Sequence, residues 1–133
     1  MLLPFSKYEG LGNDFLIIEK EALAGVRLTT EQAIALCDRH RGIGADGVLL
    51  LDLNEPSMAV INSDGSVPEM CGNGLRCAAL HLARRRGEAT LEVTVATAAG
   101  PHSCVVVNRQ DTADNGDIVV AGIPGDEGTV KTF

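Results

Sequence analysis

The sequence predicts a single domain of the α+β class. Three observations point to this class: short runs of apolar residues with strand character, two segments with helical spacing of apolar residues between capping signals, and a length of 133 residues with 45% hydrophobic residues. A chain of this length and composition can bury most of its unfolded surface in one core. We expect that core within residues 1–121 and expect a linker or tail over residues 122–133, since 122–128 are rich in turn-forming residues.

The amino-terminal part predicts two short strands joined by a turn. Phe5–Tyr8 and Phe15–Glu19 have the composition of strands. Between them, Glu9–Asp14 contains two glycines and an Asn-Asp pair, which are turn-forming residues. This loop is therefore a place where functional side chains could lie.

A first helix is expected after this pair of strands, followed by two more strands. Thr29 and Gln32 have the spacing of a capping box, and the apolar positions that follow continue to a basic segment that stops at Gly42. Val48–Leu53 is a continuous apolar run suited to a buried strand. Met58–Asn62 predicts another strand, which leads into a Ser-Asp-Gly turn.

A second helix is expected after Cys71. Apolar residues from Leu75 to Ala83 recur at helical spacing, and Arg84–Arg86 with Gly87 supply positive charge and a glycine stop. We interpret the three arginines as a solvated helix end that complements the helix dipole.

The remaining segments predict strands. Leu91–Ala96 alternates apolar and polar residues, and residues 98–101 form a turn into Ser103–Val107. Asp117–Ala121 is expected to be the last strand.

Composition excludes several classes of function. The net charge of −7 argues against binding to nucleic acid or to an anionic membrane, so the expected partner is a small molecule. The first residues lack the pattern of a secretory signal, and no apolar run reaches the length of a membrane span, which favours a cytoplasmic protein. The four cysteines lack Cys-x-x-Cys spacing and paired histidines, so we expect reduced thiols, no disulfide framework and no metal site.

Cys71 is the candidate reactive residue. It stands at or just before the first turn of the second helix, where unpaired amides and the helix dipole favour an anion such as a thiolate. Such a thiolate can act as a nucleophile or accept a proton. Gly72 and Gly74 leave the backbone open, so a ligand carboxylate could approach the amide of Asn73 and its neighbours. The sequence thus predicts a base and an anion site side by side.

Other polar or sulfur-bearing residues have ordinary structural interpretations. Three cysteines are expected to be small buried hydrophobic residues, namely Cys37, Cys77 and Cys104. Two histidines, which we place in helices near arginines, are expected to be solvated or capping: His40 and His81. Three aspartates beside glycine or asparagine are expected to build turns: Asp14, Asp46 and Asp64. Arg76 is interpreted as structural.

Four segments resemble the amino-terminal half of diaminopimelate epimerase in order and approximate spacing. They are KYEGLGNDFLIIE (7–19), RHRGIGADGVLLL (39–51), NSDGSVPEMCGNGLRCAA (62–79) and VATAAG (95–100). Together they extend over nearly the whole chain. The block around Cys71 is long and chemically unusual, which makes it far more specific than a lone glycine motif.

The resemblance implies an epimerase that works without pyridoxal phosphate or another cofactor. In this family one thiolate removes the α-proton of an amino acid, and a thiol on the opposite face returns a proton. Cys71 matches the first thiol, Gly72 and Asn73 would hold the α-carboxylate, and Asn13 and Asn62 would contact the substrate. The implied fold is a lobe in which a strongly bent, mostly antiparallel sheet or barrel surrounds a central helix, here residues 72–86.

The chain also departs from the family pattern. Family members are about twice as long, and this sequence has no second glycine-rich cysteine block. We therefore expect a carboxy-terminal lobe, or self-association through an exposed apolar face, to complete the site, and we expect the isolated chain to be nearly inactive. Two alternatives stay open: a racemase lobe for another amino acid, and a non-catalytic binding or assembly domain.

Overall fold

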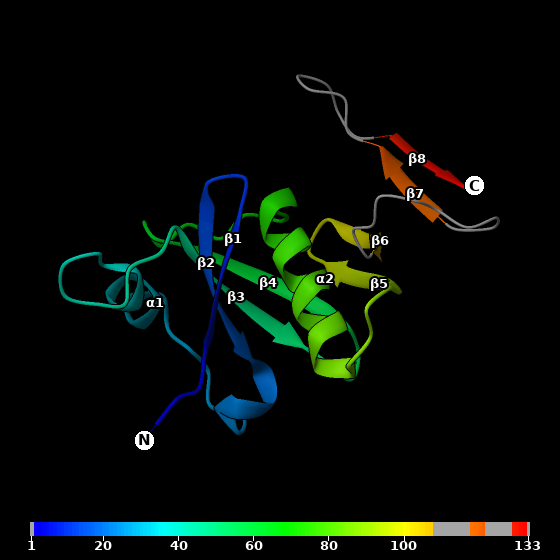
Figure 1. Ribbon diagram of the computed structural model, residues 1–133. Helices are drawn as coiled ribbons and strands as arrows, with labels where there is room; N and C mark the ends of the chain where they lie inside the picture. Colours follow the sequence, from blue (N-terminus) through cyan, green and yellow to red (C-terminus); the bar gives the residue numbers. More distant parts are fainter. Residues whose placement is uncertain (1, 108–117, 122–128, 133) are drawn as a thin grey trace.

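The computed structural model describes residues 2–107, 118–121 and 129–132. Its main feature is a curled six-stranded sheet with α2 against one face and α1 against the other (Figure 1). The strands follow the chain in order: β1 Ser6–Gly10, β2 Asn13–Glu19, β3 Gly47–Asp52, β4 Ser57–Asn62, β5 Leu91–Thr97 and β6 Gly100–Val106. The helical segments are η1 Lys20–Leu23, α1 Thr30–Cys37 and α2 Gly72–Arg86.

The sheet consists of three antiparallel pairs joined by two parallel contacts. β1 pairs with β2, β3 with β4, and β5 with β6 in antiparallel register. β2 runs parallel to β3 over five residue pairs, whereas β4 meets β5 at the single registered pair Ser57 and Ala96. A parallel connection needs a crossover, and here η1 with α1 makes the first and α2 makes the second. The expected mostly antiparallel, bent sheet is confirmed.

Both faces of the central strands are covered, which explains their continuous apolar runs. Phe15 and Ile17 of β2 pack in the cluster that contains α2, whereas Leu16 and Ile18 pack in the cluster that contains α1. The same alternation continues in β3 and β4. Successive strand residues point to opposite faces, so a strand buried on both sides must be apolar at every position.

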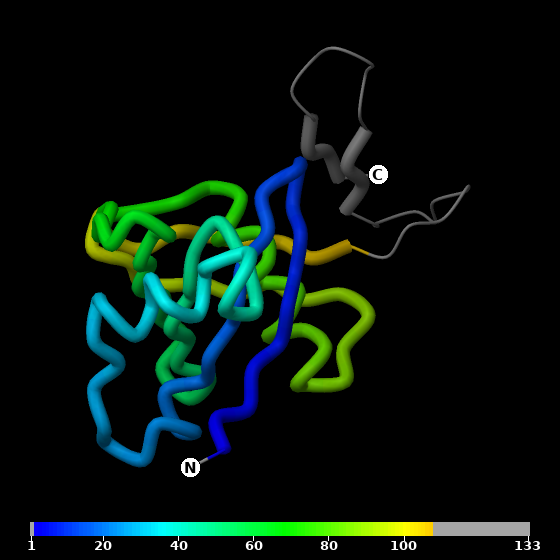
Figure 2. The backbone as a smooth tube through the Cα atoms, turned by 90° about the vertical axis from the view of Figure 1, so that its left-hand side faces the viewer, coloured from blue at the N-terminus to red at the C-terminus, as the bar shows by residue number. Residues whose placement is uncertain are grey.

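α2 is the central helix that the sequence predicts. It runs from Gly72 to Arg86 and ends at Gly87, whose φ of 68° is the left-handed conformation that glycine accepts easily. Its buried side chains pack against residues from four strands; they include Cys77, Ala78, Leu82 and Ala83. Figure 2 shows the two strands of the amino-terminal hairpin (blue) running side by side along the molecule to a tight turn.

α1 begins as predicted but ends earlier. The hydroxyl of Thr29 accepts a hydrogen bond from the Gln32 amide at 3.2 Å, and the Gln32 side chain accepts one from the Thr29 amide at 2.9 Å, so the capping box is present. The helix stops at Cys37, because the Asp38 carboxylate accepts hydrogen bonds from the amides of His40 and Arg41 and closes a turn there. The placement of His40 in a helix was therefore wrong.

The turn between β1 and β2 is shorter than expected. β1 extends to Gly10 and β2 begins at Asn13, so only Leu11 and Gly12 connect them. Both have positive φ, 53° and 87°, as two-residue hairpin turns require for the strand twist. Leu11 is 75% exposed at the tip.

Other boundaries differ by a few residues, and two elements were not predicted. β6 begins at Gly100, inside the expected turn, and η1 follows β2 directly. β7, Ile118–Ala121, lies where the last strand was expected, and it pairs with β8, Thr129–Thr132, inside the segment expected as a tail. The linker expected over 122–128 lies outside the described residues. The division at residue 121 stays a prediction.

The helices seen over the described ranges are too short or too polar to cross a bilayer. This finding accords with the sequence, in which no apolar run reaches the length of a span.

The burial of α2 predicts a clear difference between two leucines of that helix. Leu82 is 1% exposed in the core, whereas Leu80 is 37% exposed. Leu82→Ala should lower the free energy of unfolding by about 3 kcal/mol, because it leaves a cavity in a packed core. Leu80→Ala, the matched control, should cost less than about 1 kcal/mol. Urea denaturation of both variants measures the difference; equal effects would contradict a central position for α2.

Candidate active site

Cys71 is the N-cap residue of α2. Its backbone is extended, with φ −138° and ψ 113°, and its sulfur accepts a hydrogen bond from the Gly74 amide at 3.4 Å. The side chain is partly exposed. The sulfur therefore lies at the positive end of the helix dipole, as the sequence predicted, and remains accessible to a reagent.

Two amides beside this sulfur are open. No described residue accepts a hydrogen bond from the amide of Gly72 or of Asn73, and space is free around the Gly72 Cα. Gly74 is different: a Cβ there would come within 3.0 Å of Leu49 Cδ2. Gly74 thus lets α2 approach β3, while the first turn leaves donors for an anion.

Asn13 is hydrogen-bonded to this first turn. The Asn73 side-chain amide donates to Asn13 Oδ1, and Asn13 Nδ2 donates to Asp46 Oδ2 at 3.2 Å. Asn13 is the first residue of β2, so it links the sheet edge to the start of α2. Two of the predicted substrate-binding residues, Asn13 and Asn73, are therefore in direct contact.

Arg39 holds the aspartates behind Asn13. It donates to both oxygens of Asp14, at 2.8 and 3.1 Å, and to Asp46 Oδ1 at 3.1 Å. The Asp14 amide also donates to Asp46 Oδ2 at 3.0 Å, which ties the start of β2 to the loop before β3. We refer to Arg39, Asp14, Asp46, Asn13 and Asn73 as the anchoring network. Its guanidinium connects segments that are far apart in sequence.

The charges in this network perturb one another. The hydrogen bond from Arg39 is the main reason that the pKa of Asp14 lies well below its usual range; burial opposes the shift, and Lys7 at 3.3 Å adds to it. The same pairing raises the pKa of Arg39. Asp14 is therefore ionised at neutral pH.

This network corrects one sequence interpretation and leaves another in place. Asp14 and Asp46 were expected to build turns, but their carboxylates bind Arg39 and neighbouring amides across the sheet. Asp64 does build a turn: its carboxylate accepts from the amide and hydroxyl of Ser66, which lowers its pKa. No spacing in the sequence links Arg39 to Asp14. That these side chains meet can be seen only once β2 and β3 are known to pair in parallel.

Asn62 lies at the same edge of the sheet but outside the anchoring network. It is the last residue of β4, opposite Gly47 of β3, which itself pairs with Phe15 of β2. Its side chain donates to the Ser66 hydroxyl at 2.9 Å. The described contacts therefore place Asn62 near the start of β2 through register, without a hydrogen bond to Asn13 or Asn73.

The other cysteines have the surroundings of structural residues. Cys37 and Cys77 are buried, and Cys104 is partly buried on β6. Burial raises the pKa of each thiol, and for Cys77 the nearby Cys71 adds to the increase. All four are free thiols.

His81 was expected to be solvated or capping, and this interpretation was wrong. The residue is only 4% exposed; Nε2 lies 2.8 Å from Glu19 Oε1 and Nδ1 lies 3.1 Å from the Tyr8 hydroxyl. Arg85 Nε also contacts Glu19, at 2.9 Å, and Arg84 lies 5.3 Å above the Tyr8 ring. All three arginines are exposed at the end of α2, as expected, and two of them also contact residues of β1 and β2.

The described residues contain no group of three or more histidine, cysteine, aspartate or glutamate side chains placed to hold a metal ion.

These features define one class of protein: a lobe in which a curled sheet surrounds a helix that begins at an accessible cysteine. Residues 5–121 match the family model described as diaminopimelate epimerase. The chain belongs to this family.

Similar proteins carry the same name but are longer. The chain is 47% identical over 104 residues to a protein named diaminopimelate epimerase from Synechococcus elongatus, covering 75% of this chain and 37% of that relative. It is 44% identical over 130 residues to diaminopimelate epimerase 1 from a Nostoc species, covering 93% and 45%. The chain spans less than half the length of these relatives.

A solved structure, that of the Bacillus anthracis phenazine biosynthesis protein of the PhzF family, aligns with a TM-score of 0.48 and 16% sequence identity. The alignment covers 98% of this chain and 38% of that one.

The position of Cys71 predicts selective alkylation. Cys71 is accessible at a helix start, whereas burial raises the pKa of Cys37, Cys77 and Cys104. Iodoacetamide at about pH 8 should modify Cys71 at least about tenfold faster than any other thiol. Peptide mass spectrometry over a time course gives the four rates, and urea-unfolded protein is the control in which they should converge. Faster reaction at another cysteine of the folded chain would contradict the assignment.

The Asp14–Arg39 ion pair predicts a pH-dependent contribution to stability. Because the folded pKa of Asp14 lies below the unfolded value of about 3.9, its stabilisation is complete above about pH 4 and is lost as pH falls toward the folded pKa. Asp14→Asn should cost about 1 to 3 kcal/mol at neutral pH, and less with each step below about pH 4. Denaturation at several pH values measures this trend. Glu92→Gln, at an exposed position of β5, is the control; a cost of Asp14→Asn that is independent of pH would exclude the ion pair as the cause.

Proposed function

We propose that this chain is the amino-terminal catalytic lobe of a diaminopimelate epimerase, which interconverts LL- and meso-diaminopimelate for lysine and cell-wall synthesis in the cytoplasm. The observation that supports the proposal most directly is the placement of Cys71 beside the open amides of Gly72 and Asn73. Membership in the family and the shared name of the relatives support diaminopimelate as the proposed substrate.

The proposed chemistry uses these groups together. The amides of Gly72 and Asn73 bind the α-carboxylate, and Asn13 and Asn62 contact the rest of the reacting centre. The Cys71 thiolate takes the α-proton, so the C–H bond breaks and its electron pair is delocalised toward the carboxylate. The helix dipole and the amide donors stabilise the charge that develops there.

Inversion needs an acid on the opposite face. After proton removal, a thiol on the other side of the α-carbon donates its proton and becomes the thiolate for the reverse direction. Without that thiol, water would have to reprotonate the carbanion in a site that should exclude water. We assign the second thiol to a carboxy-terminal lobe, consistent with relatives more than twice as long as the matched segment.

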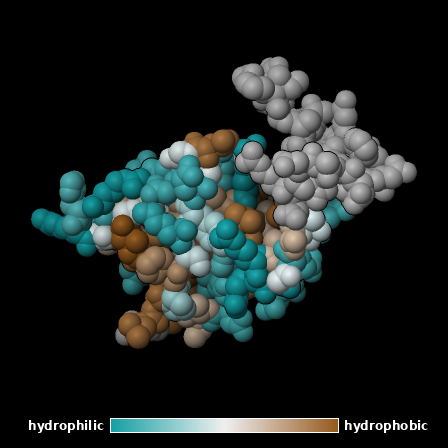
Figure 3. Space-filling view, viewed as in Figure 1, coloured by the Kyte–Doolittle hydropathy of each residue, from teal (hydrophilic) through white to brown (hydrophobic). Residues whose placement is uncertain are grey.

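Exposed apolar side chains beside the site suit contact with such a lobe. Leu11 at the hairpin tip is 75% exposed, Val67 is 65% exposed, and Met70 next to Cys71 is 39% exposed. Figure 3 shows that apolar side chains on the face in view form separate clusters among hydrophilic ones. We propose that this edge packs against the second lobe in the active enzyme.

Reconstitution tests the catalytic proposal. The 133-residue chain alone should exchange the α-proton of diaminopimelate with solvent deuterium only slowly, whereas the chain with the carboxy-terminal lobe of a relative should turn over. In the reconstituted enzyme, Cys71→Ser should lower the exchange rate by at least about a thousandfold, because a hydroxyl is a far weaker acid than a thiol.

The matched control is Cys104→Ser, which changes a thiol on β6 without a role in the proposed site. It should retain most activity. Rapid exchange by the isolated chain, or full activity of reconstituted Cys71→Ser protein, would contradict the mechanism. Mass spectrometry of the substrate measures deuterium incorporation in every case.

A further inference from the structure

A cavity lies at the other end of α2 from Cys71. It has a volume of about 300 Å³ and opens between the segment before β1, the end of β2, η1 and the last turns of α2. His81 in its wall is ten residues after Cys71, which corresponds to about 15 Å along a helix. The cavity is therefore distinct from the candidate active site.

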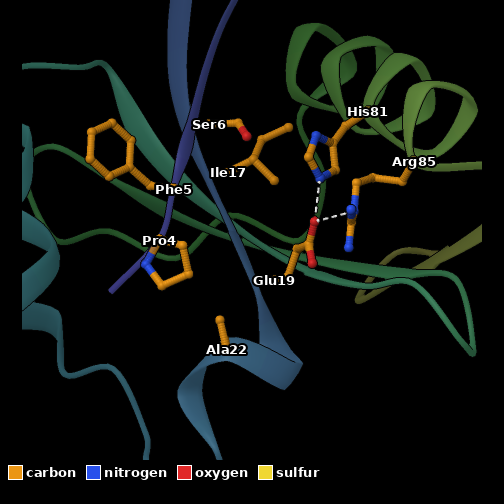
Figure 4. Close-up of a pocket in the computed structure, with 8 residues that line it drawn as sticks. All are labelled: Pro4, Phe5, Ser6, Ile17, Glu19, Ala22, His81 and Arg85. Carbon is orange, nitrogen blue, oxygen red and sulfur yellow. Dashed lines mark hydrogen bonds and ion pairs between the residues drawn. The ribbon is translucent and has the colours of Figure 1, made fainter. Parts of the chain in front are cut away.

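One wall of this cavity is apolar and the other is charged. Figure 4 shows Pro4 and Phe5 on one side and His81 and Arg85 on the other, with Glu19 beneath the helix. Ile17 and Ala22 continue the apolar wall. Phe5, which lines the cavity next to Pro4, is 48% exposed.

On the charged wall, Glu19 and Arg85 each have side-chain atoms that make no hydrogen bond within the described residues. Glu19 Oε1 contacts both His81 Nε2 and Arg85 Nε, at 2.8 and 2.9 Å, whereas no described residue donates to Glu19 Oε2. The contact of Arg85 with Glu19 is made by Nε, its two terminal nitrogens donate no hydrogen bond within the described part of the chain, and its side chain is 58% exposed. A carboxylate acceptor and a guanidinium donor are thus available next to each other.

We propose that this cavity binds a small zwitterion, namely a free α-amino acid with an apolar side chain. Its ammonium group binds Glu19 Oε2, its carboxylate binds the terminal nitrogens of Arg85, and its side chain lies against Pro4, Phe5 and Ile17. Adjacent opposite charges in the wall favour a ligand whose ammonium and carboxylate groups are attached to the same carbon. The volume stands at the lower end of the range for small-molecule sites, which suits a ligand of this size.

The buried residues behind the wall keep it in place. The Tyr8 hydroxyl holds His81 Nδ1 at 3.1 Å, and the two rings meet edge to face with centroids 5.5 Å apart. His81 in turn holds Glu19. Because these groups are fixed before a ligand enters, little ordering is required on binding.

The test uses L-leucine and two analogues that each lack one charge. Titration of the isotopically labelled 133-residue chain, followed by NMR, should give saturable shifts at amides near Ser6, Glu19 and Arg85, and none near Asn73. 4-Methylpentanoate, which lacks the ammonium group, and 3-methylbutylamine, which lacks the carboxylate, should each bind at least about tenfold more weakly. Titration to about 50 mM exceeds the millimolar constants that so few ligand atoms support.

Arg85→Gln should weaken leucine binding by about tenfold, while Arg86→Gln, an exposed neighbour outside the cavity, should leave it unchanged. Three results would overturn the proposal: no saturable shift, an analogue that binds as tightly as leucine, or shifts confined to the surroundings of Asn73. The analogue series decides the question even if Arg85→Gln does not fold. Failure here leaves the proposed epimerase function untouched, because that site lies at the opposite end of α2.

Discussion

The packing of α2 inside the curled sheet is the constraint on which the rest of the structure depends. Four strands contribute side chains to the cluster around this helix, so its axis and its two ends are fixed by the core. The first turn of α2 therefore reaches the edge where β2 begins and β4 ends. A helix start with open amides can hold an anion in a defined position only if the helix is rigid. Here the buried face of α2 provides that rigidity.

The anchoring network carries this rigidity to the side chains of the site. Arg39 connects Asp14 of β2 with Asp46 in the loop before β3, and Asp46 in turn holds Asn13, which contacts Asn73. None of these groups needs to touch a substrate for its loss to matter, because each fixes the orientation of the next. The same logic applies at the other end of α2, where Tyr8 and Glu19 hold His81.

Local signals in the sequence were sufficient to predict most helices and strands and the position of Cys71 at a helix start. The capping box at Thr29, the limits of α2 and the helix-start position of Cys71 depend on neighbours in the chain, and the structure has them where they were predicted. Asp14 and His81 were misread because their partners, Arg39 and Glu19, lie 25 and 62 residues away, and only the tertiary fold brings them together. β8 and η1 had no periodic signal long enough to predict them.

The conformation of Leu11 has a consequence for how this chain can vary. A branched side chain at φ 53° costs about 1 kcal/mol or more relative to glycine or asparagine, and at 75% exposure Leu11 recovers almost none of that cost through packing. Selection for stability alone would replace it. Glycine or asparagine at position 11 would therefore stabilise the hairpin turn, but the turn would lose the exposed apolar side chain at its tip.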